Sequence, residues 1–359
     1  MTDIAVAVER FVGQAAAENR FSGVVLVAQG NEVRFAQSYN LACRRSGVPN
    51  RIDTRFDVAS LGKMSTGVAI GQLVERGCLA FDAPISRYLP DCPSETGTRV
   101  TLHHLLTHTS GLGSIFDGGW DVASRARYRN IHDLLPYFQD HPLLLEPGTG
   151  WEYSNAGYIV LGAVIEAVTG KSYFEYVRGH IFGPASMQDT GPYSLDEDIP
   201  NLAYAASRLD PDDHEEAEPR WNNFFRHWVV STPAGCAYST VSDLFRFAQA
   251  LRHGDLVSPR MLAMLKETTV PTGQRAGQSY AYGFYVDDVG ETKTFGHAGT
   301  VPGYQAWLVI YPSLDYTVVV LGNFGHPAAR DVAWFVRDRF ATTSPHPVHT
   351  NNARESWHH

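Results

Sequence analysis

The stretch DVASLGKMSTG, residues 57–67, places Ser60 three residues before Lys63 in a run that is otherwise apolar and small. Apolar residues continue at helical spacing to about residue 76, and Gly77 follows as a stop signal, so we expect a buried helix with Ser60 in its first turn. Residues three apart lie on one face of a helix. Lys63 would then lie within reach of Ser60.

A lysine in an apolar setting is costly unless it has a partner or a task. The pair could act as a nucleophile and its base, because burial lowers the pKa of Lys63 towards a neutral amine and the helix dipole favours negative charge at Ser60. A capping serine followed by a solvated lysine gives the same pattern by chance. On this pattern alone both interpretations stay open.

Composition limits the class of protein. A chain of 359 residues with 44% hydrophobic and 19% charged residues is typical of a soluble globular protein with one large domain or two packed lobes. Its net charge of -9, without a basic stripe, argues against a nucleic-acid partner. No apolar stretch approaches the roughly 20 residues that span a bilayer, so no membrane partner is expected.

Two features suggest a cellular compartment. The N-terminal segment predicts an amphipathic helix and lacks the pattern of an export signal. The cysteines have no CxxC spacing, which favours free thiols over a disulfide framework or a zinc site; they are Cys43, Cys78, Cys92 and Cys236. We therefore expect a cytoplasmic protein, and the sequence leaves its oligomeric state open.

Secondary-structure patterns divide the chain. Two β-rich runs flank a hairpin turn at Gly30 and Asn31, further strand patterns lie between residues 280 and 325, and a helix closes the fold. Helical patterns fill about 100–190, including residues 130–140, and a later helix has Ser242 as its expected N-cap. The expected fold is α+β (mixed α/β), an antiparallel sheet flanked by helices plus a mostly helical lobe. Its predicted divisions are 1–95 with 190–342 (sheet lobe), 96–189 (helical lobe) and 343–359 (flexible tail).

Two later segments give the serine and the lysine a context: WEYSNAGY at residues 151–158 and FGHAGTVPGY at 295–304. With the first motif, in this order, they resemble the serine β-lactamase and penicillin-binding protein superfamily, particularly its branch of class C β-lactamases, DD-peptidases, D-aminopeptidases and esterases. LLTHTSGL at 105–112 and STVSDLFRF at 239–247 look like stretches common in this branch. The resemblance covers about residues 20–340 and implies a β-lactamase-like fold.

The resemblance also implies roles for individual residues. Ser60 would attack a carbonyl to form an acyl-enzyme, and Lys63 and Tyr153 would share the proton transfers. By analogy with the family, the backbone N–H groups of Ser60 and Thr300 would hold the oxyanion. Asn155 would orient either Lys63 or the acyl side chain of the substrate.

The third motif departs from its penicillin-recognising relatives. His297 stands where many of them have a lysine that pairs with the substrate carboxylate, so strong β-lactamase or carboxypeptidase activity is not expected. A neutral or partly charged histidine fits esters, amides or peptides, and a purely structural hydrogen bond across the strand is the alternative for His297. Gly299 would leave room for the substrate backbone beside the strand.

Other residues have spacings or side chains that could bind a ligand. His104 and His108 have helical zinc spacing but no third ligand, so we expect no metal and no cofactor, and His108 should make a buried hydrogen bond instead. The large aromatic residues near the motifs are Phe116, Trp120, Trp151, Trp221, Tyr304 and Trp307. Core packing should account for about half of them. A loop at residues 116–120 is expected to overhang the site. The expected pocket residues are Phe116, Trp120, Trp221 and Tyr304.

These observations favour a serine hydrolase that forms an acyl-enzyme on Ser60 and cleaves a small ester, amide or peptide. One alternative is an acyltransferase, in which an alcohol or amine takes the acyl group instead of water. Another is a non-catalytic binding module that keeps the fold. A pure binder has no chemical need for a buried lysine beside a serine, which argues against the second alternative.

Overall fold

One antiparallel sheet organises the molecule. The computed structural model describes residues 4–92, 94–113, 128–137, 142–194, 196–207, 220–221, 230–235, 237–325 and 327–341. Eight strands are hydrogen-bonded in the order β2-β1-β14-β13-β12-β11-β10-β9, and every neighbouring pair is antiparallel. Their bounds are β1 Gly23–Gln29, β2 Glu32–Tyr39, β9 Val270–Pro271, β10 Gln278–Tyr280, β11 Tyr285–Val289, β12 Thr292–Val301, β13 Tyr304–Tyr311 and β14 Tyr316–Gly322.

Strands from the two ends of the chain meet in the middle of this sheet. β1 pairs with β14 along its whole length, with Val25 opposite Val320, and β2 follows β1 through the predicted hairpin turn at Gly30, where φ is +57. Only glycine adopts such a φ without strain. The expected α+β architecture with an antiparallel sheet is confirmed.

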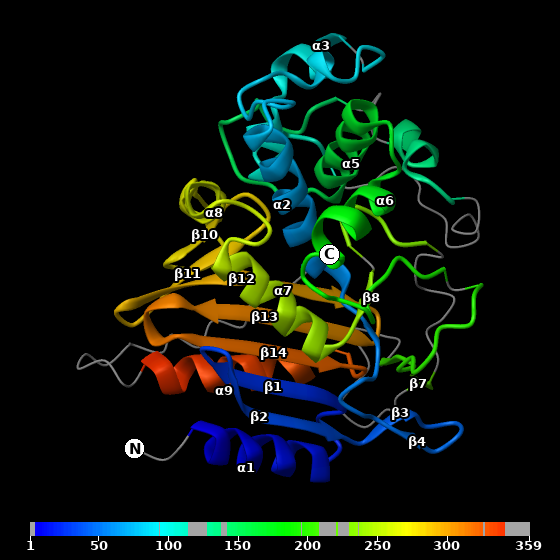
Figure 1. Ribbon diagram of the computed structural model, residues 1–359, viewed down its shortest axis with the longest axis vertical. Helices are drawn as coiled ribbons and strands as arrows, with labels where there is room; N and C mark the ends of the chain where they lie inside the picture. The colour runs from blue at the N-terminus through cyan, green and yellow to red at the C-terminus, as the bar shows by residue number, and fades with distance from the viewer. Residues whose placement is uncertain are drawn as a thin grey trace.

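The two faces of the sheet carry separate helical layers (Figure 1). α1 (Ile4–Ala17) and α9 (Ala328–Ala341) cover one face, and α7 (Val241–His253) lies on the other. Side chains alternate along β13, so that Ala306 and Leu308 belong to the larger core, which α7 shares, and Trp307 lies against the α1 and α9 cluster. Each face of the sheet therefore has its own core.

The remaining helices gather beyond one edge of the sheet around α2 (Gly62–Glu75), in the upper part of Figure 1. α2 is buried through most of its length, including Met64, Val68 and Ile70. The other helices are α3 (Ser94–Arg99), α4 (Leu102–Leu106), α5 (Asn155–Thr169), α6 (Tyr173–Val177) and α8 (Pro259–Glu267), and a π-helical turn (Arg178–Phe182) follows α6. The division into two lobes stays a prediction, and the tail at 343–359 lies outside the described residues.

Short strand pairs join distant segments around this frame. β3 (Leu41–Cys43) pairs with β4 (Val48–Pro49), and β6 (Ala206–Ser207) pairs with β7 (Arg220–Trp221). β5 (Phe56–Asp57), which leads directly into the Ser60 turn, pairs with β8 (Tyr238–Ser239). The segment before Ser60 is thereby fixed to a strand about 180 residues later in the chain.

Two local predictions need correction. Of residues 130–140, the described part forms two 3-10 turns, Ile131–Asp133 and Leu135–Tyr137, because Pro136 has no N–H for a longer helix. α7 is capped by Thr240, whose hydroxyl accepts the Asp243 N–H at 3.2 Å, and Ser242 lies inside the first turn. The sequence STVS at residues 239–242 offers three capping residues, so periodicity alone could not choose among them.

Two further findings concern the expected environment. Within the described part of the chain, no helix is long and apolar enough to cross a membrane. Cys43, Cys78 and Cys92 are free thiols, as predicted, and Cys236 lies outside the described residues.

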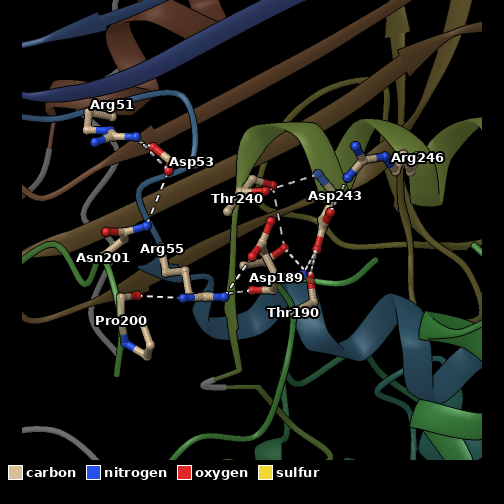
Figure 2. Close-up of polar contacts among 11 residues, drawn as sticks. Arg51, Asp53, Arg55, Asp189, Thr190, Pro200, Asn201, Thr240, Asp243 and Arg246 are labelled. Carbon is tan, nitrogen blue, oxygen red and sulfur yellow. Dashed lines mark hydrogen bonds and ion pairs between the residues drawn. The ribbon is translucent and has the colours of Figure 1, made fainter. Parts of the chain in front are cut away.

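A buried arginine ties the approach to Ser60 to the segment around residues 189–203 (Figure 2). Arg55 is 8% exposed and donates to Asp189 Oδ1 at 2.7 Å, to the Asp189 carbonyl at 3.0 Å and to the Pro200 carbonyl at 2.6 Å. A buried guanidinium is stable only when its donors are used in this way. Arg55 therefore fixes the chain that enters β5.

A buried carboxylate holds the same segment from α7. Asp243 is fully buried and accepts from the Asp189 N–H at 2.7 Å, from Thr190 Oγ1 at 2.8 Å and from Arg246 Nη1 at 2.6 Å. The Thr190 hydroxyl also contacts Ser239 Oγ in β8 at 2.7 Å. Figure 2 shows Asp243 and Thr190 side by side. Through Thr190, the same segment is therefore also bound to β8, the strand that pairs with β5.

Replacing Arg55 should be far more damaging than replacing its neighbour in Figure 2, Arg51. Arg55→Ala should lower the free energy of unfolding by about 2–3 kcal/mol, because buried carbonyls and a half-buried carboxylate lose their donor. Arg51 is 66% exposed and pairs with the exposed Asp53, so Arg51→Ala should cost about 1 kcal/mol or less. Chemical denaturation of the two variants checks this, and equal losses would contradict it.

Candidate active site

Ser60 lies in a 3-10 turn, Ala59–Leu61, that runs directly into α2. Its side chain is partly exposed, whereas Lys63 is completely buried one turn later. Ser60 Oγ and Lys63 Nζ are 3.1 Å apart. The helical spacing therefore does bring the hydroxyl and the amine into hydrogen-bond contact.

Two acceptors from distant segments hold the Lys63 amine. Nζ lies 2.7 Å from Asn155 Oδ1, at the start of α5, and 2.6 Å from the carbonyl of Ala234, in the loop before β8. A neutral amine has two N–H donors and one lone pair. In the structure Nζ also donates to Ser60 Oγ, so a protonated Lys63 uses all three of its N–H groups. After losing one proton, the amine can keep the other two acceptors and turn its lone pair to the Ser60 hydroxyl. In this arrangement Asn155 orients Lys63, one of its two expected roles.

Tyr153 lies over the same amine. Its ring centroid is 4.8 Å from Lys63 Nζ, and that of Tyr158 is 5.5 Å away. Tyr153 precedes α5, whose N-cap Ser154 accepts the Gly157 N–H at 3.1 Å. The cap marks the start of the helix, so Tyr153 and Asn155 lie on either side of the capping residue, and both contact Lys63.

His108 supports this segment rather than a metal. The Ser154 N–H donates to His108 Nδ1 at 3.0 Å, the kind of buried hydrogen bond that the sequence predicts for this residue. α4 ends at Leu106 and His108 has a φ of +59, so His104 and His108 do not share a helical face. Among the described residues, no group of three or more histidine, cysteine or acidic side chains could hold a metal ion.

Two glycines press against the backbone on either side of Ser60. A Cβ on Gly299, in β12, would lie 2.3 Å from the Val58 carbonyl oxygen and 3.0 Å from the Ser60 nitrogen. A Cβ on Gly235 would lie 2.4 Å from the Ala59 carbonyl oxygen. The sequence suggested that Gly299 leaves room for the substrate backbone. In the structure, the space left by its missing side chain is filled by residues 58–60.

Gly235 and Ala234 are the site residues that sequence reasoning missed. Gly235 adopts a φ of +146, which side chains rarely tolerate, and Ala234 contributes only its carbonyl. The Pro-Ala-Gly run at 233–235 signals a turn but nothing about what the turn contacts. Thr300 is exposed beside Gly299 on β12, and its role as an oxyanion donor stays a prediction.

His297 is a buried, neutral side chain. Its Nδ1 lies 2.5 Å from the Ala298 carbonyl, which can only accept, so Nδ1 carries the proton and Nε2 accepts from Tyr280 Oη at 2.9 Å. Burial and the positive charge of Lys63 lower the pKa of His297 to about 3. With 2% exposure, His297 makes the structural hydrogen bonds of the alternative interpretation and carries no positive charge near neutral pH.

The large aromatic residues near the motifs fall into three groups. Tyr304 is 4% exposed and donates its hydroxyl to the Ala203 carbonyl, which places it in the core rather than at an open pocket. Trp307 packs on the far face of the sheet, and Trp151 lies beside Tyr153 with ring centroids 6.2 Å apart. Phe116, Trp120 and the expected overhanging loop, with the side chain of Trp221, lie outside the described residues.

Replacing Gly299 with alanine should displace Ser60. The added methyl group would overlap the Val58 carbonyl, which is backbone and cannot rotate away. Gly299→Ala should lower any Ser60-dependent turnover by about 100-fold and cost about 1–3 kcal/mol of stability. Gly13→Ala in α1, where nothing lies within 4 Å, is the matched control and should change neither quantity adversely. Turnover and chemical denaturation of both variants are the measurements.

His297 should make the protein less stable in acid. Its folded pKa is lowered from the ordinary 6.5 to about 3, so between these values the unfolded chain binds a proton that the folded one does not. The free energy of unfolding therefore falls as pH drops from about 6.5 towards 3, by up to about 1.4 kcal/mol per pH unit from this residue. His297→Gln should reduce that slope. The exposed His253→Gln should leave it unchanged in parallel urea titrations.

Comparison with known proteins places this geometry in a family. The family model described as Beta-lactamase matches residues 8–342. Penicillin-binding protein 4* of Bacillus subtilis is 31% identical, over 85% of this chain and 69% of its own length. Esterase EstB of Burkholderia gladioli is also 31% identical, over 83% of this chain and 84% of its own length.

Solved structures agree. A penicillin-binding protein from Bacillus halodurans superimposes with a TM-score of 0.82 and 31% identity, covering 95% of this chain and all of its own. D-amino acid amidase from Ochrobactrum anthropi, at 23% identity and a TM-score of 0.80, covers 95% of this chain and 99% of its own and has the same fold. The family match over nearly the whole chain, with these relatives, shows that this protein belongs to the β-lactamase family of serine hydrolases.

Proposed function

We propose that this chain is a serine hydrolase that forms an acyl-enzyme on Ser60 and cleaves a small ester or amide. The observation that carries the proposal is the 3.1 Å contact between Ser60 Oγ and Lys63 Nζ, with Lys63 completely buried. To act as a general base, Lys63 must first lose its proton, and its neutral amine can then take the proton of the Ser60 hydroxyl. The partly exposed hydroxyl remains accessible to a substrate carbonyl.

In the acylation step, the Ser60 hydroxyl proton moves to Lys63 Nζ as Oγ attacks the substrate carbonyl. The tetrahedral intermediate collapses when the C–O or C–N bond to the leaving group breaks, and the leaving group takes a proton from the Lys63 and Tyr153 pair. Water then attacks the acyl carbonyl and gives a proton to the Lys63 and Tyr153 pair. The bond between Ser60 Oγ and the acyl carbon breaks, Oγ takes that proton, and the free acid leaves. The Ser60 and Thr300 N–H groups hold the oxyanion in both steps.

The electrostatics around Lys63 favour substrates that lack a carboxylate next to the scissile bond. His297, on the strand beside Lys63, is neutral and buried, so it offers no cation to such a carboxylate. An ester or a primary amide carries no charge at that point. EstB is named as an esterase and the Ochrobactrum relative as a D-amino acid amidase, in agreement with this preference.

The test is intact-protein mass spectrometry after brief incubation with short-chain p-nitrophenyl esters, a D-amino-acid amide and a penicillin. Wild type should gain the mass of the acyl group and release free acid. Ser60→Ala should gain none and lose turnover by about 10³-fold or more. Ser65→Ala, a partly exposed serine on the same helix, is the control and should behave as wild type.

The products separate the remaining functions. With an added alcohol or amine, free acid should dominate; an acceptor adduct in excess of free acid would replace hydrolysis by acyl transfer. A wild type that neither gains mass nor turns over any of the three probes would contradict the proposal and favour a binding module.

A further inference from the structure

The residue immediately before Ser60 has an unusual backbone conformation. Ala59 has a φ of +48, in the left-handed region that residues with a Cβ rarely occupy. Such a conformation persists only where surrounding interactions hold it. Ala59 is 2% exposed and is the first residue of the 3-10 turn that carries Ser60.

A buried carboxylate provides one such interaction. Asp57, the last residue of β5, is 1% exposed, and its Oδ1 accepts the Ala59 N–H at 2.8 Å. An aspartate that binds the N–H two residues ahead stabilises a turn. Because burial of a carboxylate is costly without hydrogen bonds, this contact also helps to hold Asp57 in place.

The contact bears directly on the Ser60 N–H. Rotation about the Ala59 backbone would turn the peptide between residues 59 and 60, and with it the direction in which the Ser60 N–H points. Gly235 and Gly299 lie against this peptide on either side, at positions where a Cβ would come within 3.0 Å of the Ser60 nitrogen. Packing against the two glycines therefore limits how far the peptide between Ala59 and Ser60 can move. The hydrogen bond from Asp57 selects the backbone conformation of Ala59.

We propose that Asp57 is a positioning residue for the oxyanion site: its carboxylate holds Ala59 in the left-handed conformation and so aims the Ser60 N–H at the substrate carbonyl oxygen. The proposal rests on the serine hydrolase function proposed above and adds to it. The hydrogen bond, rather than the charge, does the positioning, because the acceptor is a single carboxylate oxygen at the geometry of an ordinary turn.

The experiment compares four variants with wild type on one p-nitrophenyl ester: Asp57→Ala, Asp57→Asn, Ala59→Gly and the double variant Asp57→Ala with Ala59→Gly. The measurements are kcat, KM, the rate of acyl-enzyme formation and thermal unfolding. Glycine adopts a φ near +48 without strain. Glycine therefore removes the steric cost that Asp57 offsets at this position, although it restores no hydrogen bond.

Asp57→Ala should lower kcat by about 30- to 100-fold with KM changed less than about threefold, since the oxyanion forms only in the transition state. Asp57→Asn keeps an oxygen acceptor and should stay within about threefold of wild type. Adding Ala59→Gly to Asp57→Ala should recover at least tenfold in kcat. A fifth variant, Asp57→Ala with Ala17→Gly in α1, is the control for the added glycine and should recover nothing.

Three results would overturn the proposal: wild-type kcat in Asp57→Ala, a loss in Asp57→Asn as large as in Asp57→Ala, or no recovery of kcat in the double variant. If Asp57→Ala does not fold, the double variant and Asp57→Asn decide. A folded, active double variant supports the backbone role, and a double variant that also fails to fold refutes it.

Failure of the underlying function gives a different result. If wild type forms no acyl-enzyme with any probe and Ser60→Ala behaves like wild type, the serine hydrolase function itself is wrong. If wild type acylates and Ser60→Ala does not, only the assignment of Asp57 depends on the four variants.

Discussion

The buried amino group of Lys63 is the constraint on which the site depends. An amine that is fully removed from water needs acceptors at hydrogen-bond distance, and isolating it would cost several kcal/mol. Lys63 finds them in its own helical turn, at the start of α5 and in the loop before β8. Satisfying one side chain thus requires three parts of the chain to assemble with an accuracy of a few tenths of an ångström.

Close backbone packing around α2 makes that accuracy possible. A Cβ on Gly67 would lie 2.2 Å from the Tyr282 carbonyl oxygen, and one on Gly283, where φ is +91, would lie 2.7 Å from the Lys63 carbonyl oxygen. Gly235 and Gly299 approach the Ser60 turn in the same way. These contacts explain the run of small residues around Ser60: larger side chains would separate the helix from the segments that supply acceptors to Lys63.

Four described side chains near Lys63 are polar but neutral. Burial raises the pKa of Tyr158, Tyr280 and Tyr285 well above the usual value and, with the charge of Lys63, lowers that of His297 to about 3. These side chains can donate and accept hydrogen bonds without changing charge between pH 5 and 8. When Lys63 gains or loses a proton, none of these four groups changes its own charge to compensate. The full change in charge therefore acts on the electrostatic potential at the site.

The sequence by itself determined the strand pattern, the buried Ser60 helix and the pairing of Ser60 with Lys63, because these follow from periods of two and 3.6 residues and from spacing within one turn. Tertiary structure decided the rest. Asn155 and Ala234 meet Lys63 from 92 and 171 residues away, His108 leaves the helix that its spacing with His104 suggested, and Gly299 makes room for the chain itself. Such contacts depend on how the sheet brings distant segments together, and periodicity along the chain carries no record of them.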